Sequence, residues 1–477
     1  MSINFKYKIS QGLKWSFVGT YGGQIVGFFI SIFLARLLSP EDFGIVGMSL
    51  SVIQILKVAM SLGFSDALIQ NKDNSHRAYS TVFIINLSLG ILITVLIYIS
   101  APLIAQFYGR VELISIVKLL SIIYLLESLS VVQVAILKKE LNFKSLSIRS
   151  LVAQIVSGTF ATVLAFLGYG IYALVVHHIM INTLRTFLLW RMSHWRPKLE
   201  FSWEEARKLW GFASYSFSSI AVNKVFNASQ SLVIGKVFNA EILGYFARAQ
   251  SFSQLIVQNS SSSIRTLLFP ALSSIQDDQE RFLKGYMVVS EIVAILSVVL
   301  CTLSIINAEV LVIGLFGAKW APVIPIFMWL MIKSIVVPNN GIIITTILAK
   351  GYAKENFNYV VIKQFIAMLP VIFLFFGDME TFLHSLVAAG VIVLGVSYYS
   401  AYKLLQMSFW GQFKPLFILV SISSLILLLL QNAITFESSI LKAFVNSTIY
   451  LLCMGGFLWL NHKEIIKESA RLIRVKG

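Results

Sequence analysis

Three ionisable side chains are predicted to lie deep inside membrane-spanning segments, where no water is available to solvate a charge. Glu127, Lys224 and Lys333 each lie about ten or more residues from either end of a long apolar segment. At a rise of about 1.5 Å per residue, no side chain extends from that depth to the membrane surface. A charge at a helix centre costs about 2.5–3.5 kcal/mol on insertion scales, so each of these residues needs a polar cavity or a partner.

The two lysines indicate a different chemistry from the glutamate. Buried ammonium groups favour a water-filled cavity that faces an anionic substrate, because phosphate and carboxylate groups need charge-assisted donors once they lose water. A structural ion pair is the alternative for Lys224 and Lys333. For Glu127 the two explanations are balanced, because a buried carboxyl group can remain protonated and uncharged.

Five other cations lie nearer to the ends of their predicted helices. Lys57, Arg185 and Lys363 are about 6–8 Å from the cytoplasmic end. Lys118 and Arg248 are about 6–9 Å from the outer end. A long side chain can place its charge at the membrane surface from there, so that explanation competes with a binding role. We expect Arg248, with Lys57 or Arg185 nearer the cytoplasm, to add positive charge to the substrate cavity.

Polar side chains recur at helical spacing on three of these segments. Asn223 and Asn227 lie one helical turn apart, in line with serines on the same face of the predicted helix over 211–237. Similar stripes follow the predicted helices over 44–62 and 244–262. Such residues can simply connect helices by hydrogen bonds. Because each stripe includes a cation, a cavity between the two halves is favoured, with Asn223 and Asn227 among its substrate-binding residues.

A transporter also needs an energy source, and three carboxylates are candidates for binding a coupling ion. They are Glu127, Glu291 and Asp66. The sequence does not distinguish protons, sodium or the membrane potential as the driving force.

Proline and glycine predict two special packing sites. A hinge or broken helix is predicted at Pro338 and Gly341, because proline removes a backbone hydrogen bond in mid-membrane and the freed groups must face protein or water. Gly19, Gly23 and Gly27 recur at four-residue steps, which predicts a seam for close helix packing.

The patterns that catalysis requires are missing from the sequence. It contains no paired-carboxylate cluster, HExxH motif, P-loop or nucleophile elbow. No catalytic residue, metal site or cofactor is therefore predicted, and we expect a transporter and not an enzyme. The net charge of +16 is explained by basic residues in the loops on one side of the membrane. No nucleic-acid motif accompanies that charge, so a nucleic-acid partner is not expected.

The composition determines the elements that must position these residues. Hydrophobic residues make up 57% of the 477 positions and charged residues 13%, against roughly 25% charged in soluble domains. Apolar segments long enough to cross about 30 Å of hydrocarbon must be helices here. We predict an all-α polytopic membrane protein with about 14 transmembrane helices. Their expected ranges are 11–37, 44–62, 79–105, 112–134, 147–168, 171–190, 211–237, 244–262, 284–307, 322–349, 359–376, 382–404, 414–431 and 441–460.

The segments 31–56 and 231–256 repeat each other. Glu41 and Gly44 of the first copy align with identical residues of the second. Six predicted helices separate the copies, so both enter the membrane in the same direction, as in transporters built from parallel repeats. The positive-inside rule places both termini in the cytoplasm. The expected domains are an N-terminal six-helix lobe (1–190), a cytoplasmic linker with a short surface helix (191–210), a C-terminal six-helix lobe (211–405) and an extra helix pair with a basic tail (406–477).

Four sequence elements resemble the Wzx-type polysaccharide flippases of the multidrug/oligosaccharidyl-lipid/polysaccharide exporter superfamily. They are ARLLSPEDFGIVGM, QGLKWSF, LGFSDALIQNKD and KKELNFKSL. The similarity extends over essentially the whole chain and is strongest to exporters of colanic-acid or teichuronic-acid type. The resemblance implies two six-helix lobes in a V shape, with the first, second, seventh and eighth helices around a central cavity. The two additional C-terminal helices distinguish this sequence from a minimal family member.

The resemblance also implies a function. A protein of this type flips an undecaprenyl-diphosphate-linked oligosaccharide across the bacterial inner membrane by alternating access, for the biosynthesis of cell-surface lipopolysaccharide or exopolysaccharide. The implied partners are this lipid-linked oligosaccharide, membrane lipids, and a polysaccharide polymerase with its export machinery. The predicted cations would bind the diphosphate and any acidic sugars.

Other functions remain open. A cation-coupled multidrug or small-solute antiporter of the same superfamily would need acidic groups to dominate the cavity, whereas the predicted cavity is mainly cationic. A peptidoglycan-precursor flippase would carry a different lipid-linked cargo. A polymerase subunit would need a large outer loop, which the predicted topology lacks.

Overall fold

Contacts divide the structure into two compact units. The computed structural model describes residues 3–60, 63–71, 74–433 and 438–461. Within these ranges, the side chains of residues 3–10, 13, 58–60, 212, 214–224, 226–227, 258–263, 266–267, 431–433 and 461 lie outside the description. The first unit comprises residues 1–247 and the second comprises residues 248–477. The predicted domain limits at 190, 210 and 405 stay predictions.

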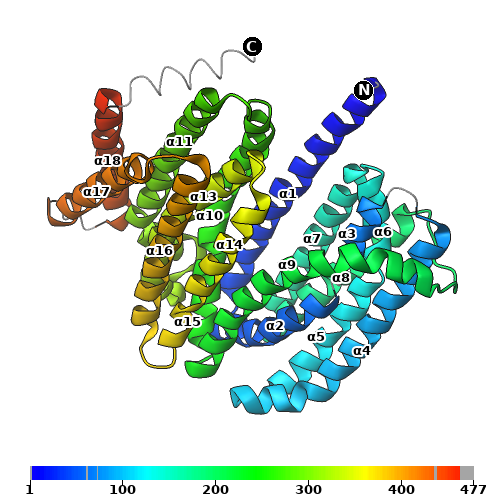
Figure 1. Cartoon of the computed structure of the whole chain (residues 1–477). Helices are drawn as coiled ribbons and strands as arrows, with labels where there is room; N and C mark the ends of the chain where they lie inside the picture. Colours follow the sequence, from blue (N-terminus) through cyan, green and yellow to red (C-terminus); the bar gives the residue numbers. More distant parts are fainter. Residues whose placement is uncertain (1–2, 61–62, 72–73, 434–437, 462–477) are drawn as a thin grey trace. The chain divides into compact units, whose positions relative to one another are not determined.

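The helices are coloured along the sequence in Figure 1. The first unit contains α1 (Ile3–Leu37), α2 (Pro40–Met60), α3 (Phe64–Gln70), α4 (His76–Tyr108), α5 (Leu113–Ser128), α6 (Val131–Lys139), α7 (Phe143–Phe166), α8 (Ile171–Met192) and α9 (Trp203–Val237). Helix α10 (Ala240–Ser273) begins in the first unit and continues into the second. The second unit also contains α11 (Gln279–Ile306), α12 (Ala308–Phe316), the 3-10 helix η1 (Ala318–Trp320), α13 (Val323–Ala349), α14 (Ala353–Met368), α15 (Pro370–Phe373), α16 (Met379–Leu405), α17 (Phe409–Ala433) and α18 (Ser439–Asn461).

Within the first unit, long helices pack in pairs around short ones. Helix α4 lies along α5, and α7 packs against both α1 and α8 (Figure 1). Helices α2 and α4 also contact α9. A buried apolar cluster joins the short helices α3 and α6 to α4 and α9, through Phe64, Val132, Phe83 and Leu209. This cluster fixes one end of α6, which carries a cavity residue described below.

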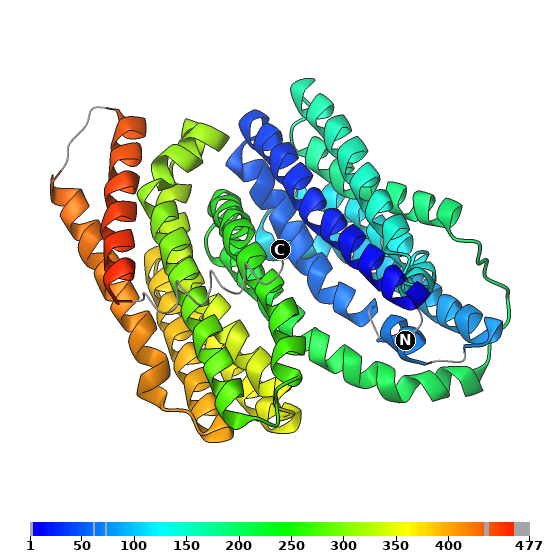
Figure 2. The same cartoon turned by 90° about the horizontal axis from the view of Figure 1, so that it is seen from above.

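The second unit is built around α11, α13 and α16. Helix α13 packs against both α11 and α16, and α14 packs against α16. The additional C-terminal helices α17 and α18 both contact α11 (Figure 2). Helix α13 runs without interruption through Pro338 and Gly341. The helix is therefore not broken in this structure, and the predicted hinge stays a prediction.

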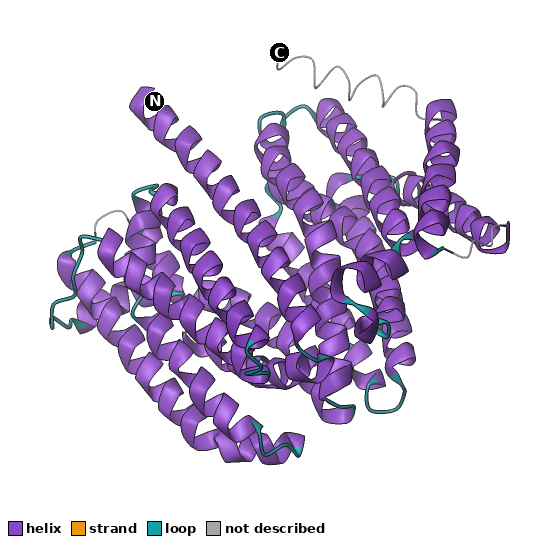
Figure 3. Cartoon of the chain, turned by 180° about the vertical axis from the view of Figure 1, so that it is seen from behind, coloured by secondary structure: helices purple, strands orange, loops and turns teal. Residues whose placement is uncertain are grey.

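The described residues form helices and connecting loops, with no strand among them (Figure 3). This confirms the predicted all-α class. In the part of the chain that the structure describes, 11 helical segments are long and apolar enough to cross a membrane. Helices α2, α9 and α10, which carry the polar stripes, are not among those segments. The count of about 14 spans therefore stays a prediction.

Two predicted helices are interrupted in the structure. The helix expected over 112–134 is divided into α5 and α6. The helix expected over 359–376 starts earlier, at Ala353, and is interrupted before Pro370, whose ring and missing N–H disfavour continuation. Lys363 therefore lies in the middle of a span of 21 residues, Ala353–Phe373, and not near one end as the sequence predicted.

The surface helix expected within residues 191–210 is the first part of α9. Ser202 caps this helix, since its Oγ accepts a hydrogen bond from the Glu205 N–H at 3.4 Å. The Ser202 N–H donates to Thr81 Oγ1 at 3.0 Å, and Ser75 Oγ donates to Glu205 Oε1 at 2.8 Å. These bonds fix the start of α9 to the start of α4.

The two repeated segments form matching hairpins. Helices α1 and α9 each have 35 residues, and α2 and α10 begin three residues after them, at Pro40 and Ala240. The first turns of α2 and α10 touch backbone to backbone. A Cβ atom on Gly44 would collide with the carbonyl oxygen of Ala240, and one on Gly244 would collide with that of Pro40. The glycine that both copies share is thus the residue that allows the helices to cross.

Candidate functional site: a cationic cavity in the first unit

An open cavity of about 640 Å³ lies between α1, α6, α7 and α8. Its cations come from three helices: Lys138 from α6, Arg149 from α7 and Arg185 from α8. None of the fourteen lining residues that the structure describes is acidic. The uncharged polar lining consists of Ser16, Thr20, Gln24, Ser147, Ser150 and Gln154. Such a lining suits an anion that also offers hydroxyl groups, such as a phosphate attached to a sugar.

Glycines on α1 shape this cavity. A Cβ atom on Gly19 would collide with Ser147 of α7, and one on Gly27 would lie 3.1 Å from the Gln154 amide nitrogen. Helices α1 and α7 therefore pack closely at these two positions, which confirms the predicted seam there. A Cβ atom on Gly23 would meet nothing within 4 Å, and this residue lines the cavity. The middle glycine leaves room for a ligand between two close contacts.

The two arginines of the cavity have N–H groups that form no hydrogen bond with a described protein acceptor. Arg185 Nη2 donates to Ser150 Oγ at 3.4 Å. Among the described residues, the buried Nε of Arg185 and the buried Nε and Nη1 of Arg149 have no hydrogen-bond partner. Buried polar atoms in native proteins are nearly always hydrogen-bonded to protein, water or ligand. The oxygens of an anion, or water, bound beside these arginines would satisfy these donors.

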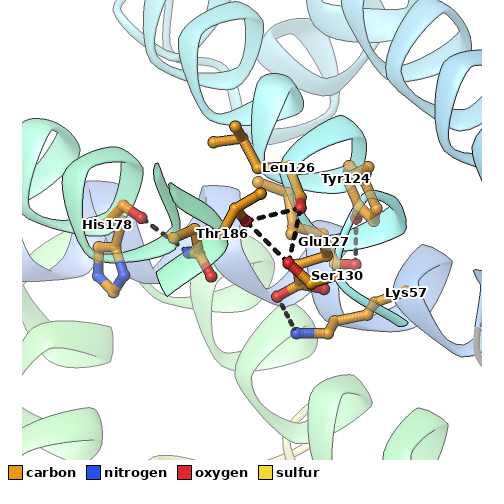
Figure 4. A network of polar contacts seen from close by, with 9 residues as sticks. Lys57, Tyr124, Leu126, Glu127, Ser130, His178 and Thr186 are labelled. Atoms are coloured by element: carbon orange, nitrogen blue, oxygen red, sulfur yellow. Dashed lines mark hydrogen bonds and ion pairs between the residues drawn. The ribbon is translucent and has the colours of Figure 1, made fainter. Parts of the chain in front are cut away.

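An ion pair links the same region to α2 (Figure 4). Lys57 Nζ donates to Glu127 Oε1 at 2.5 Å, and the side chains are 39% and 24% exposed. On the preceding turn of α5, the Tyr124 hydroxyl donates to the Ile53 carbonyl of α2. The partner of Glu127 is therefore a lysine from another helix, and this ion pair explains how a carboxylate is stabilised at this depth.

Hydrogen bonds also attach the end of α5 to α8. Thr186 Oγ1 donates to the Leu126 carbonyl at 2.9 Å, and the Ser130 and Thr186 hydroxyls lie 2.9 Å apart (Figure 4). The Glu127 carboxylate attracts Arg185, and Arg185 repels Arg149. Among the described residues named here, one carboxylate, Glu127, stands against four cations, Lys57, Lys138, Arg149 and Arg185, so the region keeps an excess of positive charge.

Two other predicted substrate-binding cations, Arg248 and Lys333, belong to the second unit. Arg248 is buried in the second unit, where its guanidinium lies 5.0 Å from the ring centre of Phe316 and 5.2 Å from that of Trp320. Lys333 lies on α13 of the same unit, with its stem close to Gly390 of α16. The structure therefore places Lys57 and Arg185 in one unit and Arg248 and Lys333 in the other. The side chains of Lys224, Asn223 and Asn227 lie outside the described residues.

The coupling-ion candidates lie in three different settings. Glu127 is paired with Lys57. Glu291 lines a cavity of about 50 Å³ in the second unit, together with Asn339 and Gln412. Asp66 lies in the first turn of α3, where a carboxylate is stabilised by the helix dipole. Among the described residues, no group of three or more His, Cys, Asp and Glu side chains could hold a metal ion.

Sequence reasoning missed Arg149 and Lys138 as cavity residues. The predicted helix began at residue 147, which put Arg149 at its very end. Helix α7 starts earlier, at Phe143, so that Arg149 lies in its second turn. Ser150 and Gln154 lie on the same helix, near Arg149, and they were the available signal. Arg185 alone of the three cavity cations was among the predicted substrate-binding residues.

Comparisons with known proteins agree on a family. The profile of the family described as polysaccharide biosynthesis protein matches residues 33–325, which is more than half of the chain. The chain is 26% identical over 356 residues to the teichuronic acid biosynthesis protein TuaB of Bacillus subtilis, with 73% of each chain covered. It is 25% identical over 318 residues to the succinoglycan biosynthesis transport protein ExoT of Rhizobium meliloti, covering 67% of this chain and 64% of that protein. It is 23% identical over 372 residues to the lipopolysaccharide biosynthesis protein WzxC of Escherichia coli, covering 78% and 75%.

Solved structures show the same fold at low identity. The lipid II flippase MurJ in an inward closed conformation has a TM-score of 0.74 and 16% identity, with 93% of this chain and 98% of that chain covered. An inward-facing multidrug resistance MATE family transporter of the MOP superfamily has a TM-score of 0.63 and 14% identity, with 83% and 96% covered. The fold is thus that of multi-pass membrane transporters. The family match and the relatives confirm the resemblance to Wzx-type polysaccharide flippases, and the chain belongs to the family of polysaccharide biosynthesis proteins.

Proposed function

We propose that the protein flips undecaprenyl-diphosphate-linked oligosaccharide repeat units across the bacterial inner membrane by alternating access, for cell-surface polysaccharide biosynthesis. One observation carries this proposal: the acid-free cavity in which Arg149 and Arg185 hold buried donors without acceptors among the described residues. A diphosphate has several charged oxygens, and the fork of an arginine matches their geometry. The lipid tails remain in the bilayer throughout.

The cavity also has room and polarity for part of the sugar. Its hydroxyl and amide groups lie on α1 and α7, and α7 also contributes the apolar lining residues Phe143 and Leu146. Sugar hydroxyls form hydrogen bonds with such groups, and sugar rings pack on apolar faces. The names of the relatives, which refer to teichuronic acid, succinoglycan and lipopolysaccharide, support an oligosaccharide cargo.

In this proposal about 14 helices form two parallel six-helix lobes, with α17 and α18 appended and both termini in the cytoplasm. Lys57, whose charge Glu127 now balances, lies beside the path of the diphosphate. Lys224, Lys333 and Arg248, together with Asn223 and Asn227, bind the anionic cargo at other stages of transport. A polysaccharide polymerase and its export machinery use the flipped unit.

The test replaces cavity cations in a strain that depends on this protein for its surface polysaccharide. We expect R149A and R185A each to reduce surface polysaccharide per inserted protein by roughly tenfold or more, because losing one charge-assisted hydrogen bond costs about 1.5–3 kcal/mol. Lipid-linked oligosaccharide should accumulate in the cytoplasmic leaflet of the same cells. R185K should retain part of the activity, since a lysine keeps the charge but loses the fork.

The matched control is R191A. Arg191 lies on the same helix as Arg185, over the ring of Phe187 and not in the cavity lining, so its loss should leave polysaccharide near the wild-type amount. Wild-type polysaccharide in the R149A/R185A double variant would refute this site. Reconstituted protein that moves a lipid-linked peptidoglycan precursor, but no lipid-linked oligosaccharide, would instead support the alternative flippase.

A further inference from the structure

Lys363 is buried in the second unit at the middle of a membrane-spanning segment. It is the eleventh residue of the span Ala353–Phe373, and the residue is 6% exposed. At about 1.5 Å per residue, roughly 15 Å separate it from either end of the span. The side chain therefore cannot place its charge at the membrane surface, and burial among helices also separates it from lipid.

Very little in the surroundings of Lys363 stabilises an ammonium group. Its Nζ donates one hydrogen bond, to Ser397 Oγ of α16 at 3.3 Å. Within the described part of the chain, no carboxylate oxygen lies within 4.0 Å of this nitrogen. An ammonium group has three N–H donors to satisfy. Intramembrane lysines of this kind are rare, and they mark ion pathways and proton relays.

The hydrogen-bonded neighbours of Lys363 suit both of its protonation states. Ser397 Oγ lies 2.5 Å from Asn340 Oδ1 of α13 and 3.0 Å from the Val393 carbonyl, and it can donate to either. A serine hydroxyl can accept from an ammonium group, and it can also rotate to donate to a neutral amine. Ser397 can therefore form a hydrogen bond with Lys363 in either protonation state.

A polar layer continues from this point through the unit. Asn339, next to Asn340 on α13, donates to Ser297 Oγ of α11 at 3.3 Å. Asn339 also lines the cavity of about 50 Å³ that Glu291 lines, and a cavity of that size is large enough for a water molecule. Polar side chains of α11, α13, α14 and α16 thus meet at one level, next to the predicted hinge at Pro338.

The charged groups on the packed helices do not neutralise Lys363. Helix α15 has none, and α13 contributes Lys333, which lies near Gly390, about two helical turns along α16 from Ser397. The rings of Tyr359 and Tyr399 pair at 6.4 Å about one turn away. The remaining titratable groups lie in the first turn of α14, in the first two turns of α16 or in its last two turns. They are Lys354, Glu355, Glu380, His384, Tyr398, Tyr402 and Lys403.

We propose that Lys363 is a proton-binding site that is loaded and unloaded during transport, so that the coupling ion is a proton carried by an amine. Binding adds H⁺ to the Nζ lone pair, and release returns it to water, with no other bond formed or broken. The charge on Lys363 then determines how Ser397 bonds to Asn340, beside the segment of α13 that is predicted to bend. The coupling to cargo rests on the proposed function, whereas proton binding by Lys363 does not.

A direct measurement tests the site without any cargo. The protein is labelled with ¹⁵N at lysine Nζ, placed in bilayers and studied by solid-state NMR as the pH is changed. We expect one signal to change between the ammonium and amine positions, and to be missing from K363M. K354M, which removes an exposed lysine of the same helix, should keep that signal. A Lys363 signal that remains ammonium, or remains amine, over the whole range in which the protein stays folded would overturn the proposal.

A second measurement links the site to transport. In proteoliposomes that contain lipid-linked oligosaccharide, an imposed pH gradient should change the flipping rate of the wild type and of K354M. K363M should lose this response, and K363R, which stays charged, should stop after a single turnover. A wild-type response in K363M would contradict the coupling role. Titration of Lys363 without any flipping by the wild type would refute the proposed function and leave the proton site standing.

Discussion

The two repeated hairpins share their backbone course and differ in their side-chain contacts. In the first copy, the α2 cap pairs Ser39 with Asp42, whose N–H donates to Ser39 Oγ at 3.1 Å. In the second copy, Asn239 Oδ1 accepts from the Ile242 N–H at 2.8 Å. Both caps satisfy the free N–H groups at a helix start, with different residues. The shared glycine, by contrast, has no substitute, because its contact is with backbone.

The difference between the copies increases along α2 and α10. Lys57 of the first copy is paired with Glu127, whereas the equivalent Val257 is buried in an apolar cavity of the second unit. Met48 is a buried apolar residue, whereas the equivalent Arg248 lies over two aromatic rings. The residues that the copies share therefore determine how the helices cross, whereas the charged residues differ between the copies. We expect residues with a specific role in transport to lie among these differences.

The largest effect should come from the shared glycines. G44A places a Cβ against the Ala240 carbonyl oxygen, and G244A does the same against Pro40, so each should destabilise the protein by about 3 kcal/mol. Thermal unfolding of the purified protein measures this. G395A, where a Cβ meets nothing within 4 Å, is the control. Because both glycines belong to one crossing, the double variant should lose less than the sum of the two.

The next largest effect concerns the ion pair that the second copy lacks. E127Q leaves Lys57 without its partner and should cost about 2 kcal/mol, between the values for exposed and buried pairs. K57V gives the first copy the residue of the second. Replacing both partners should restore part of the stability lost in E127Q, and independent, additive losses in a double-mutant cycle would contradict a direct pair.

A smaller effect is expected where the second copy carries the extra charge. R248M gives the second copy the residue of the first and removes two cation–π contacts, so it should lower stability by about 1 kcal/mol. Polysaccharide per inserted protein should also fall, because the proposed function assigns this guanidinium, which lies over the rings of Phe316 and Trp320, to the anionic cargo. Wild-type export by R248M would remove Arg248 from the cargo-binding residues.

The smallest effect compares two serines at equivalent positions. Ser51 is 2% exposed and lies 3.2 Å from the Tyr108 hydroxyl, whereas Ser251 is exposed. S51A should cost about 0.5–1 kcal/mol, the usual net value of a buried hydrogen bond. S251A should leave the melting temperature unchanged within error. Equal losses in melting temperature would show that the two copies have the same surroundings here.

Much of the fold could be predicted, because hydropathy and repeats act locally. The turn between α1 and α2 and its copy between α9 and α10 lie where the alignment of the two segments requires. The start of α14 could not be found in this way, because its first turn, around Lys354 and Glu355, is polar yet helical. Predicting the helix from its apolar run alone placed Lys363 too close to the surface.

The candidate site could be predicted only in part. Arg185 was recognisable as a cation inside an apolar helix, and so was Glu127. Their neighbours depend on tertiary packing: Lys57 and Glu127 are 70 residues apart in the sequence, and nothing in either segment indicates the other. Arg149 was missed for a similar reason, since its role depends on how α1 and α7 pack around Gly23.

The uninterrupted course of α9 has a mechanical consequence. From Trp203 to Val237 it is a single rod of 35 residues, about 50 Å long, with one end bonded to the start of α4 through Ser202 and Glu205. From Trp203 onwards, the segment that leads into the second repeat is therefore a helix and not a flexible tether. A displacement of the Trp203 end would therefore be transmitted along the rigid helix to the turn that precedes α10, near Gly244.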